Sequence, residues 1–140
     1  MSRLEIESNS EEVNNHEISE EIYPDIKNWD DLDINPSLLR GIYAYGFEKP
    51  SPIQEKAIVP LMNKKDLIAQ AQSGTGKTAA FTIGSLQSID ITKNQTQVLI
   101  LSPTRELCVQ TAKVIEGIGS MMKGLKVHTM FGGNSYETST

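Results

Sequence analysis

The octet Ala71-Gln72-Ser73-Gly74-Thr75-Gly76-Lys77-Thr78 constrains this chain more than any other part of its sequence. It follows the short apolar run Leu67-Ile68-Ala69 and precedes Ala79-Ala80-Phe81, which is typical of a helix. A strand, a glycine-rich turn, Lys-Thr and a helix make up the P-loop arrangement. Its turn directs backbone N–H groups into one concavity, and the helix N-terminus adds a positive dipole end. The octet therefore predicts a site for nucleotide phosphates.

Two side chains of the octet have predicted roles. Lys77 is placed to reach the terminal phosphates, and Thr78 to put its hydroxyl on Mg²⁺. One position departs from the general pattern, because Ala71 stands where the first glycine is usual. The alternative interpretation is a loop before a helix that happens to contain two glycines.

Apolar periodicity predicts four helices in the chain. A capping residue followed by proline marks two helix starts, at Asn35-Pro36 and at Ser51-Pro52. The first of these helices is expected to run to about Tyr45, and the second to end at Asn63-Lys64. Two more are expected, one from the octet to about Ile89 and one from Thr104 to the glycines that begin at Gly117.

Three segments of strand length alternate with these helices, at residues 66–71, 97–101 and 126–131, and 97–101 is a continuous apolar run. Continuous apolar strands are typical of parallel sheets that are covered on both faces. Strands and helices that alternate in this way predict right-handed crossovers. The expected fold is therefore α/β, a parallel sheet with flanking helices.

Charge divides the 140 residues unevenly, although the net charge is only −5. Residues 1–33 hold 11 acidic and 2 basic residues, and the remainder holds 7 acidic and 11 basic residues. The acidic start lacks apolar periodicity, so residues 1–28 are expected to form a disordered tail before a domain at 29–140. The mildly basic body is compatible with a nucleic-acid partner.

Several classes of protein are disfavoured by the composition. Cys108 is the single cysteine, which fits a reducing compartment and indicates a small buried apolar residue rather than a reactive thiol. The first 19 residues carry no hydrophobic stretch of a secretory signal, and no apolar run approaches the length of a membrane span. We therefore expect an intracellular protein without a membrane partner, located in the cytoplasm, with the nucleus as the alternative.

The segment Gly46–Gln54 has two interpretations. Ser51 and Gln54 fit a capping box at the start of a helix, with Phe47 as a hydrophobic staple. Alternatively, the Gln54 amide offers a donor and an acceptor that suit the N6/N7 edge of adenine, and Phe47 stacks on the base. The segment alone favours the capping box.

Five segments in order resemble the DEAD-box RNA helicases. Gly46–Gln54 is similar to their Q motif, with Trp29 at the place of an isolated aromatic residue 17 positions upstream. The octet resembles their motif I, including its alanine, and the loop and helix start at Pro103-Thr104-Arg105-Glu106-Leu107 resemble motif Ia. Gly132-Gly133 resembles the GG motif. The stretch from Leu38 to Ser51 is especially similar to the translation initiation factor 4A branch.

The resemblance implies a RecA-like domain with ATP and Mg²⁺ as cofactors. Phe47 and Gln54 would read adenine, and the octet would hold the phosphates, with Ser73 to Gly76 as their cradle. RNA would bind through its sugar-phosphate backbone, whether single-stranded or duplex, to the residues of the last two motifs, Pro103, Thr104, Arg105, Gly132 and Gly133. For Arg105, the alternative is a salt bridge with Glu106 or a neighbouring loop. A translation initiation scaffold would be a further partner.

The resemblance covers only part of such a helicase. No Asp-Glu-Ala-Asp follows Gly133, and only seven residues remain. The carboxylates that hold Mg²⁺ and orient water, and the second RecA-like domain, are therefore not expected within these 140 residues. We expect the domain to be incomplete at its C-terminus and the isolated chain to be inactive. A non-catalytic binding fragment and a small P-loop kinase are the alternative functions.

Overall fold

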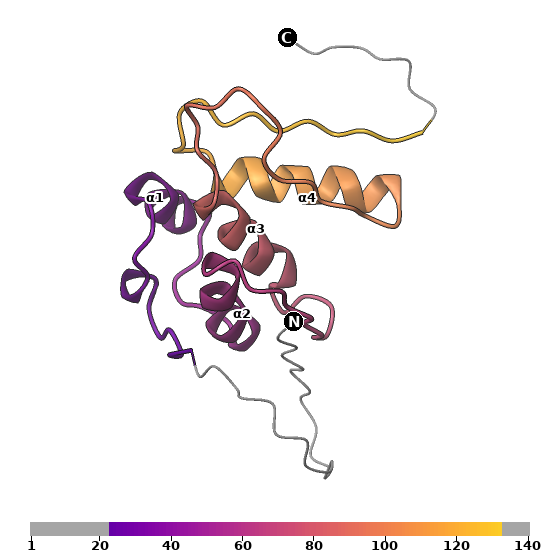
Figure 1. Ribbon diagram of the computed structural model, residues 1–140. Coiled ribbons are helices and arrows are strands. Elements are labelled where there is room, and N and C mark those ends of the chain that lie inside the picture. The colour runs from indigo at the N-terminus through magenta and orange to yellow at the C-terminus, as the bar shows by residue number, and fades with distance from the viewer. Residues whose placement is uncertain (1–22, 133–140) are drawn as a thin grey trace.

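Four α-helices account for most of the regular structure in the computed structural model, which describes residues 23–132 (Figure 1). A short 3-10 helix, η1 (Trp29–Asp31), comes first. It is followed by α1 (Pro36–Ala44), α2 (Pro52–Met62), α3 (Lys77–Gln87) and α4 (Arg105–Ile118). Helix α3 packs against α2 on one side and α4 on another, and α1 contacts both α3 and α4. None of the helices within residues 23–132 has the length and apolar character needed to cross a membrane.

The helices begin where the capping signals predict. The Asn35 side chain accepts a hydrogen bond from the Ser37 N–H, 2.8 Å away, and Pro36 is the first residue of α1. The Thr104 hydroxyl accepts from the Leu107 N–H at 3.2 Å, so α4 starts directly after it. Each side chain satisfies an N–H group that the first helical turn leaves without a partner. All four predicted helices are confirmed, with ends that differ by one or two residues from the prediction.

The core lies among the helices. The largest of its fully buried side chains come from η1 and from all four helices; they are Trp29, Leu38, Ile42, Ile58, Ile83, Leu86 and Ile118. Helices α1 and α4 approach so closely that a Cβ atom on Gly41 would lie 1.9 Å from the Ile118 carbonyl oxygen. Glycine is therefore required in α1 for this packing.

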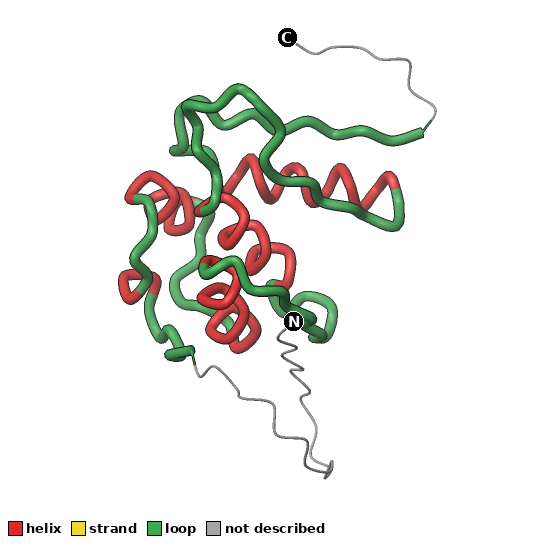
Figure 2. Tube along the Cα trace, viewed as in Figure 1, coloured by secondary structure: helices red, strands yellow, loops and turns green. Residues whose placement is uncertain are grey.

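The predicted parallel sheet is absent from residues 23–132. Residues 66–71, 97–101 and 126–131 run as loops instead of strands (Figure 2). No backbone–backbone hydrogen bond joins any of these three segments to another part of residues 23–132. Each segment exposes at least one large apolar side chain, and Leu99 and Leu101 are 78% and 85% exposed. The sheet is not confirmed here, because a strand exists only with a hydrogen-bonded neighbour, whereas an apolar run indicates only that burial is favourable.

Packed structure extends into the segment predicted as an acidic tail. Residues 1–22 lie outside the described residues, but Ile26 is 3% exposed and belongs to the core. Lys27 Nζ forms an ion pair with Glu55 at 2.8 Å, which raises the pKa of Lys27. This segment therefore packs against α2 before Trp29 is reached.

Candidate functional site

The octet 71–78 forms a tight turn that leads into α3. Gly74 and Gly76 have φ angles of 81° and 92°, in the left-handed region that favours glycine. Gly76 is the N-cap of α3, and Lys77 is the first residue of that helix. Two side chains bond back to the carbonyls that precede the turn: Lys77 Nζ donates to Ala71, and Thr75 Oγ1 donates to Gln72 at 2.7 Å. The predicted turn before a helix is therefore present.

The start of α3 has the features of an anion site. The N–H groups in the first turn of a helix have no partner from a preceding turn, and the helix dipole places partial positive charge there. Thr78 is half-buried at the second position of α3, while Ala79 and Ala80 are buried against the core. The exposed Lys77 and the turn before it are thus fixed to a packed helix.

The segment Gly46–Gln54, which resembles the Q motif, is joined directly to this turn. Ser51 Oγ donates to the Thr75 carbonyl at 2.7 Å, and Gln54 Nε2 donates to the Gly76 carbonyl at 3.3 Å. A Cβ atom on Gly76 would lie 2.4 Å from Gln54 Nε2, so only glycine fits at this position. The start of α2 and the turn before α3 therefore form one unit, although Ser51 and Thr75 are 24 residues apart in sequence.

Gln54 also forms the predicted capping box. Its Oε1 accepts from the Ser51 N–H at 2.9 Å, and the side chain is only 2% exposed. A glutamine amide has two N–H donors and two acceptor lone pairs. Capping and the contact with Gly76 use one of each, so one donor and one lone pair of Gln54 remain.

Phe47 is held by aromatic neighbours. The Trp29 indole N–H donates to the Phe47 carbonyl at 3.2 Å, and the two ring centroids are 6.2 Å apart. The Tyr45 ring also packs against the Phe47 ring, with their centroids 5.1 Å apart. The Tyr43 hydroxyl donates to the Asp30 carboxylate, which raises the pKa of Tyr43 and ties η1 to α1. The fully buried Trp29 therefore fixes the backbone of Phe47.

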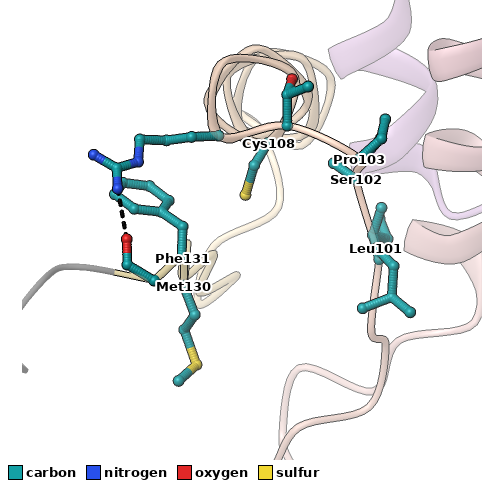
Figure 3. A pocket seen from close by; sticks show the side chains of 10 residues that line it. Leu101, Ser102, Pro103, Cys108, Met130 and Phe131 are labelled. Atoms are coloured by element: carbon teal, nitrogen blue, oxygen red, sulfur yellow. Dashed lines mark hydrogen bonds between the residues drawn. The ribbon is translucent and has the colours of Figure 1, made fainter.

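A second group of predicted site residues surrounds a hollow of about 390 Å³ at the start of α4 (Figure 3). The Arg105 guanidinium lies over the Phe131 ring, 4.8 Å from its centroid, and donates to the Gly132 carbonyl. Pro103, Thr104 and Gly132 also line the hollow. The structure thus brings the motif Ia residues and the first glycine of the GG pair together, while Gly133 lies outside the described residues.

The salt bridge that was the alternative interpretation of Arg105 is not found within residues 23–132. Within residues 23–132, Arg105 forms no ion pair with Glu106 or any other carboxylate. Its contact is with the neighbouring loop, through an aromatic ring and a carbonyl group. The charge of the guanidinium therefore remains without an acidic partner in this part of the chain.

The sequence was compared with models of known protein families. A model of the DEAD/DEAH box helicase family matches residues 51–140. The chain belongs to this family. The small-kinase alternative is thereby excluded, because the matched segment holds the octet, motif Ia and the GG pair together.

Curated relatives confirm the resemblance to the initiation factor 4A branch of the DEAD-box family. The chain is 54% identical over 108 residues to the ATP-dependent RNA helicase eIF4A of Schizosaccharomyces pombe, covering 77% of this chain and 27% of that protein. It is 49% identical over 131 residues to the ATP-dependent RNA helicase eIF4A of Aspergillus clavatus, covering 94% of this chain and 30% of that protein. The chain thus spans about three tenths of the length of these relatives.

Solved DEAD-box structures share the arrangement of the described residues. A DEAD box protein from the hyperthermophile Methanococcus jannaschii is similar with a TM-score of 0.74 and 37% identity, covering 79% of this chain and 30% of that one. S. cerevisiae Dbp5 bound to RNA and ADP BeF3 is similar with a TM-score of 0.64 and 45% identity, covering 69% of this chain and 25% of that one. The helical frame is therefore that of a DEAD-box domain, although residues 23–132 contain no strand.

Three contacts of this DEAD-box chain could not be read from its sequence. They are the bond from Ser51 to Thr75, the bond from Trp29 to the Phe47 carbonyl, and the ring of Phe131 beneath Arg105. Each joins residues that lie far apart in sequence, and no local pattern encodes such a pairing. The signal available in advance was limited to an aromatic residue directly before Gly132 and a hydroxyl residue at the start of α2.

Proposed function

We propose that the chain is the ATP-binding part of an ATP-dependent RNA helicase that unwinds or remodels RNA, with a role in translation initiation. The observation that carries this proposal is the direct bonding of Ser51 and Gln54 to the turn before α3. It joins a residue suited to a base edge with a turn suited to phosphates. The names of the relatives, ATP-dependent RNA helicases eIF4A, support the same activity.

The phosphates of ATP would be held by the turn and the start of α3. A Cβ atom on Gly74 would have nothing within 4 Å, so the backbone is open to a close approach at that point. Ser73 to Gly76 would offer N–H groups, and Lys77 would exchange the Ala71 carbonyl for the terminal phosphates. Mg²⁺, when bound, neutralises phosphate charge; the Thr78 hydroxyl would be its ligand from this chain, a hard oxygen of the kind that the ion prefers.

Adenine would be recognised by Gln54 and Phe47. The donor and the lone pair left on the Gln54 amide match N7 and the N6 amino group of adenine, respectively. Because Gln54 is 2% exposed, its neighbours would open for the base to reach these atoms. A base with the opposite donor pattern would leave these buried groups unpaired, which makes the site selective for adenine.

RNA would bind through its backbone at the hollow beside α4. Pro103, Thr104 and Arg105 would line the path of the strand, and Gly132 and Gly133 would let a phosphate approach the main chain. A Cβ atom on Gly132 would have nothing within 4 Å, which supports the access that this role requires. Contacts to phosphate carry no information on the bases, so binding would not depend on RNA sequence. A translation initiation scaffold is proposed as a protein partner.

The sheet and the remaining catalytic groups belong to the same proposal. Residues 66–71, 97–101 and 126–131 would be parallel strands of a RecA-like domain when their neighbouring strands are present. The 140 residues alone would bind but not hydrolyse ATP, because they contain no Asp-Glu-Ala-Asp. A non-catalytic binding fragment is thus the second candidate for the isolated chain.

RNA-stimulated hydrolysis of ATP and GTP tests the proposed function. The protein expressed from its complete reading frame should hydrolyse ATP with RNA present and should use GTP poorly. Gln54→Ala should reduce the preference for ATP, whereas Gln110→Ala, at an exposed position of α4, should leave it unchanged. Equal use of ATP and GTP by the unmodified protein would contradict the assignment of adenine recognition and leave Gln54 as a capping residue.

A further inference from the structure

The Arg105 side chain is exposed, yet two contacts fix its guanidinium. The group lies over the Phe131 ring at 4.8 Å from the centroid and donates to the Gly132 carbonyl (Figure 3). The two contacts come from consecutive residues, Phe131 and Gly132, which follow α4 in the sequence. An exposed arginine without such contacts samples many rotamers and loses that freedom when it binds a ligand.

The aromatic contact leaves the hydrogen-bonding capacity of Arg105 intact. A guanidinium has five N–H donors. A ring face attracts it through the ring quadrupole, and this attraction does not use the N–H groups as hydrogen-bond donors. Only one N–H group is directed to the Gly132 carbonyl. A carboxylate partner would instead have neutralised the charge and occupied two donors. The group is thus oriented, still positive, and able to form a fork with a phosphate.

We propose that Phe131 is a positioning residue for RNA: its ring holds the Arg105 guanidinium in the orientation that receives a backbone phosphate. The proposal rests on the proposed function, in which Arg105 contacts RNA. It adds a residue outside the motif Ia and GG segments. The half-buried Phe131 provides the ring, and Gly132 keeps the adjacent backbone open.

Substitutions at Phe131 test this role in RNA affinity. In the protein expressed from its complete reading frame, Phe131→Leu should weaken binding to several unrelated single-stranded RNAs by about two- to fivefold, the loss expected for one exposed cation–π contact. Phe131→Tyr and Phe131→Trp keep a ring face and should retain or strengthen binding. Met121→Leu, at an exposed apolar position outside this hollow, is the control and should have no effect.

Salt dependence separates positioning from direct contact. Arg105→Ala should reduce the slope of log affinity against log salt by about 0.7, because one phosphate contact with single-stranded RNA is lost. Phe131→Leu should leave that slope unchanged, since the charge is still present. In the Arg105→Ala background, Phe131→Leu should have no further effect on affinity, because the ring acts only through the guanidinium.

Each other result has a distinct meaning. Additive losses in the double variant would overturn the proposal and indicate that the Phe131 ring contacts RNA itself. Normal affinity for Phe131→Leu together with a loss for Arg105→Ala would overturn the proposal alone. Normal affinity for both variants would instead contradict the RNA contact of Arg105 and so the RNA part of the proposed function. If Phe131→Leu lowers the melting temperature, its weaker binding could come from lost stability, and Phe131→Trp then provides the test. Weaker RNA binding by Phe131→Trp, which keeps a ring face, would contradict the positioning role.

Discussion

The two halves of the predicted site differ in how they are held. The nucleotide half rests on helices α2 and α3, where Gln54 is 2% exposed and bonds to the turn at Gly76. The RNA half is carried by the start of α4 and by loops, where Leu99 and Leu101 are 78% and 85% exposed. Both halves contain segments that resemble motifs of the family. Only the first is surrounded by packed structure within residues 23–132.

The difference follows from the range of the interactions that each element needs. A helix satisfies its backbone within a few residues, so a cap and an apolar stripe are enough to define it. A strand takes its hydrogen bonds from a neighbour that is distant in sequence. The helical half therefore forms from the residues at hand, while residues 97–101 leave Leu99 and Leu101 exposed.

The largest expected effect is the loss of Trp29. Trp29→Ala in the 140-residue chain should lower the free energy of unfolding by about 3–5 kcal/mol, because it removes a fully buried aromatic side chain. Chemical denaturation followed by circular dichroism measures this change. Trp29→Phe, which keeps a ring but loses the donor to the Phe47 carbonyl, should cost less. A loss below about 1 kcal/mol for Trp29→Ala would show that the nucleotide half is not packed as described.

A smaller effect is expected in the turn itself. Gly76→Ala should destabilise the chain by about 1–3 kcal/mol, because it combines a left-handed φ with a contact on Gln54 Nε2. Gly74→Ala is the matched control, since its φ is also positive but its Cβ atom would meet nothing within 4 Å. Thermal melts of both variants give the comparison. Equal losses would mean that the contact between Gln54 and the turn is absent in solution.

The cap of α4 should contribute less still. Thr104→Ala should cost about 1 kcal/mol, the typical value for the loss of an N-cap hydroxyl. Thr104→Ser keeps the hydroxyl and should be close to neutral in the same denaturation experiment. No change in stability for Thr104→Ala would indicate that α4 does not begin at Arg105 in solution. The start of α4 would then be as weakly held as the loops of the RNA half.

The smallest effect is expected at the exposed apolar segments. Leu101→Ser should change the stability of the 140-residue chain by less than about 0.5 kcal/mol, because the side chain is 85% exposed. The buried Leu38 provides the contrast, since Leu38→Ala should cost about 2–5 kcal/mol. A loss above 1 kcal/mol for Leu101→Ser, measured by urea denaturation, would show that residues 97–101 are buried in solution and that the contrast is wrong.

The sequence predicted those parts of the fold and of the site that depend on local chemistry. The caps at Asn35 and Thr104 and the turn at Gly76 are all present, because each is decided within a few residues. The sheet was not predictable in the same way, since hydrophobicity shows that a segment favours burial but not what covers it. The bond between Ser51 and Thr75 was missed for a related reason: it depends on how α2 packs on α3.

The assignment of residues 71–78 as the phosphate site is tested most directly by the affinity of the protein for ATP with Mg²⁺. Binding of a fluorescent ATP analogue to the protein from the complete reading frame should be lost or weakened by at least about tenfold in Lys77→Ala, because a charge-assisted contact to phosphate disappears. Lys113→Ala removes an exposed charge from α4 and should leave affinity unchanged. The same affinity in Lys77→Ala as in the unmodified protein would contradict the assignment of residues 71–78 as the nucleotide-phosphate site.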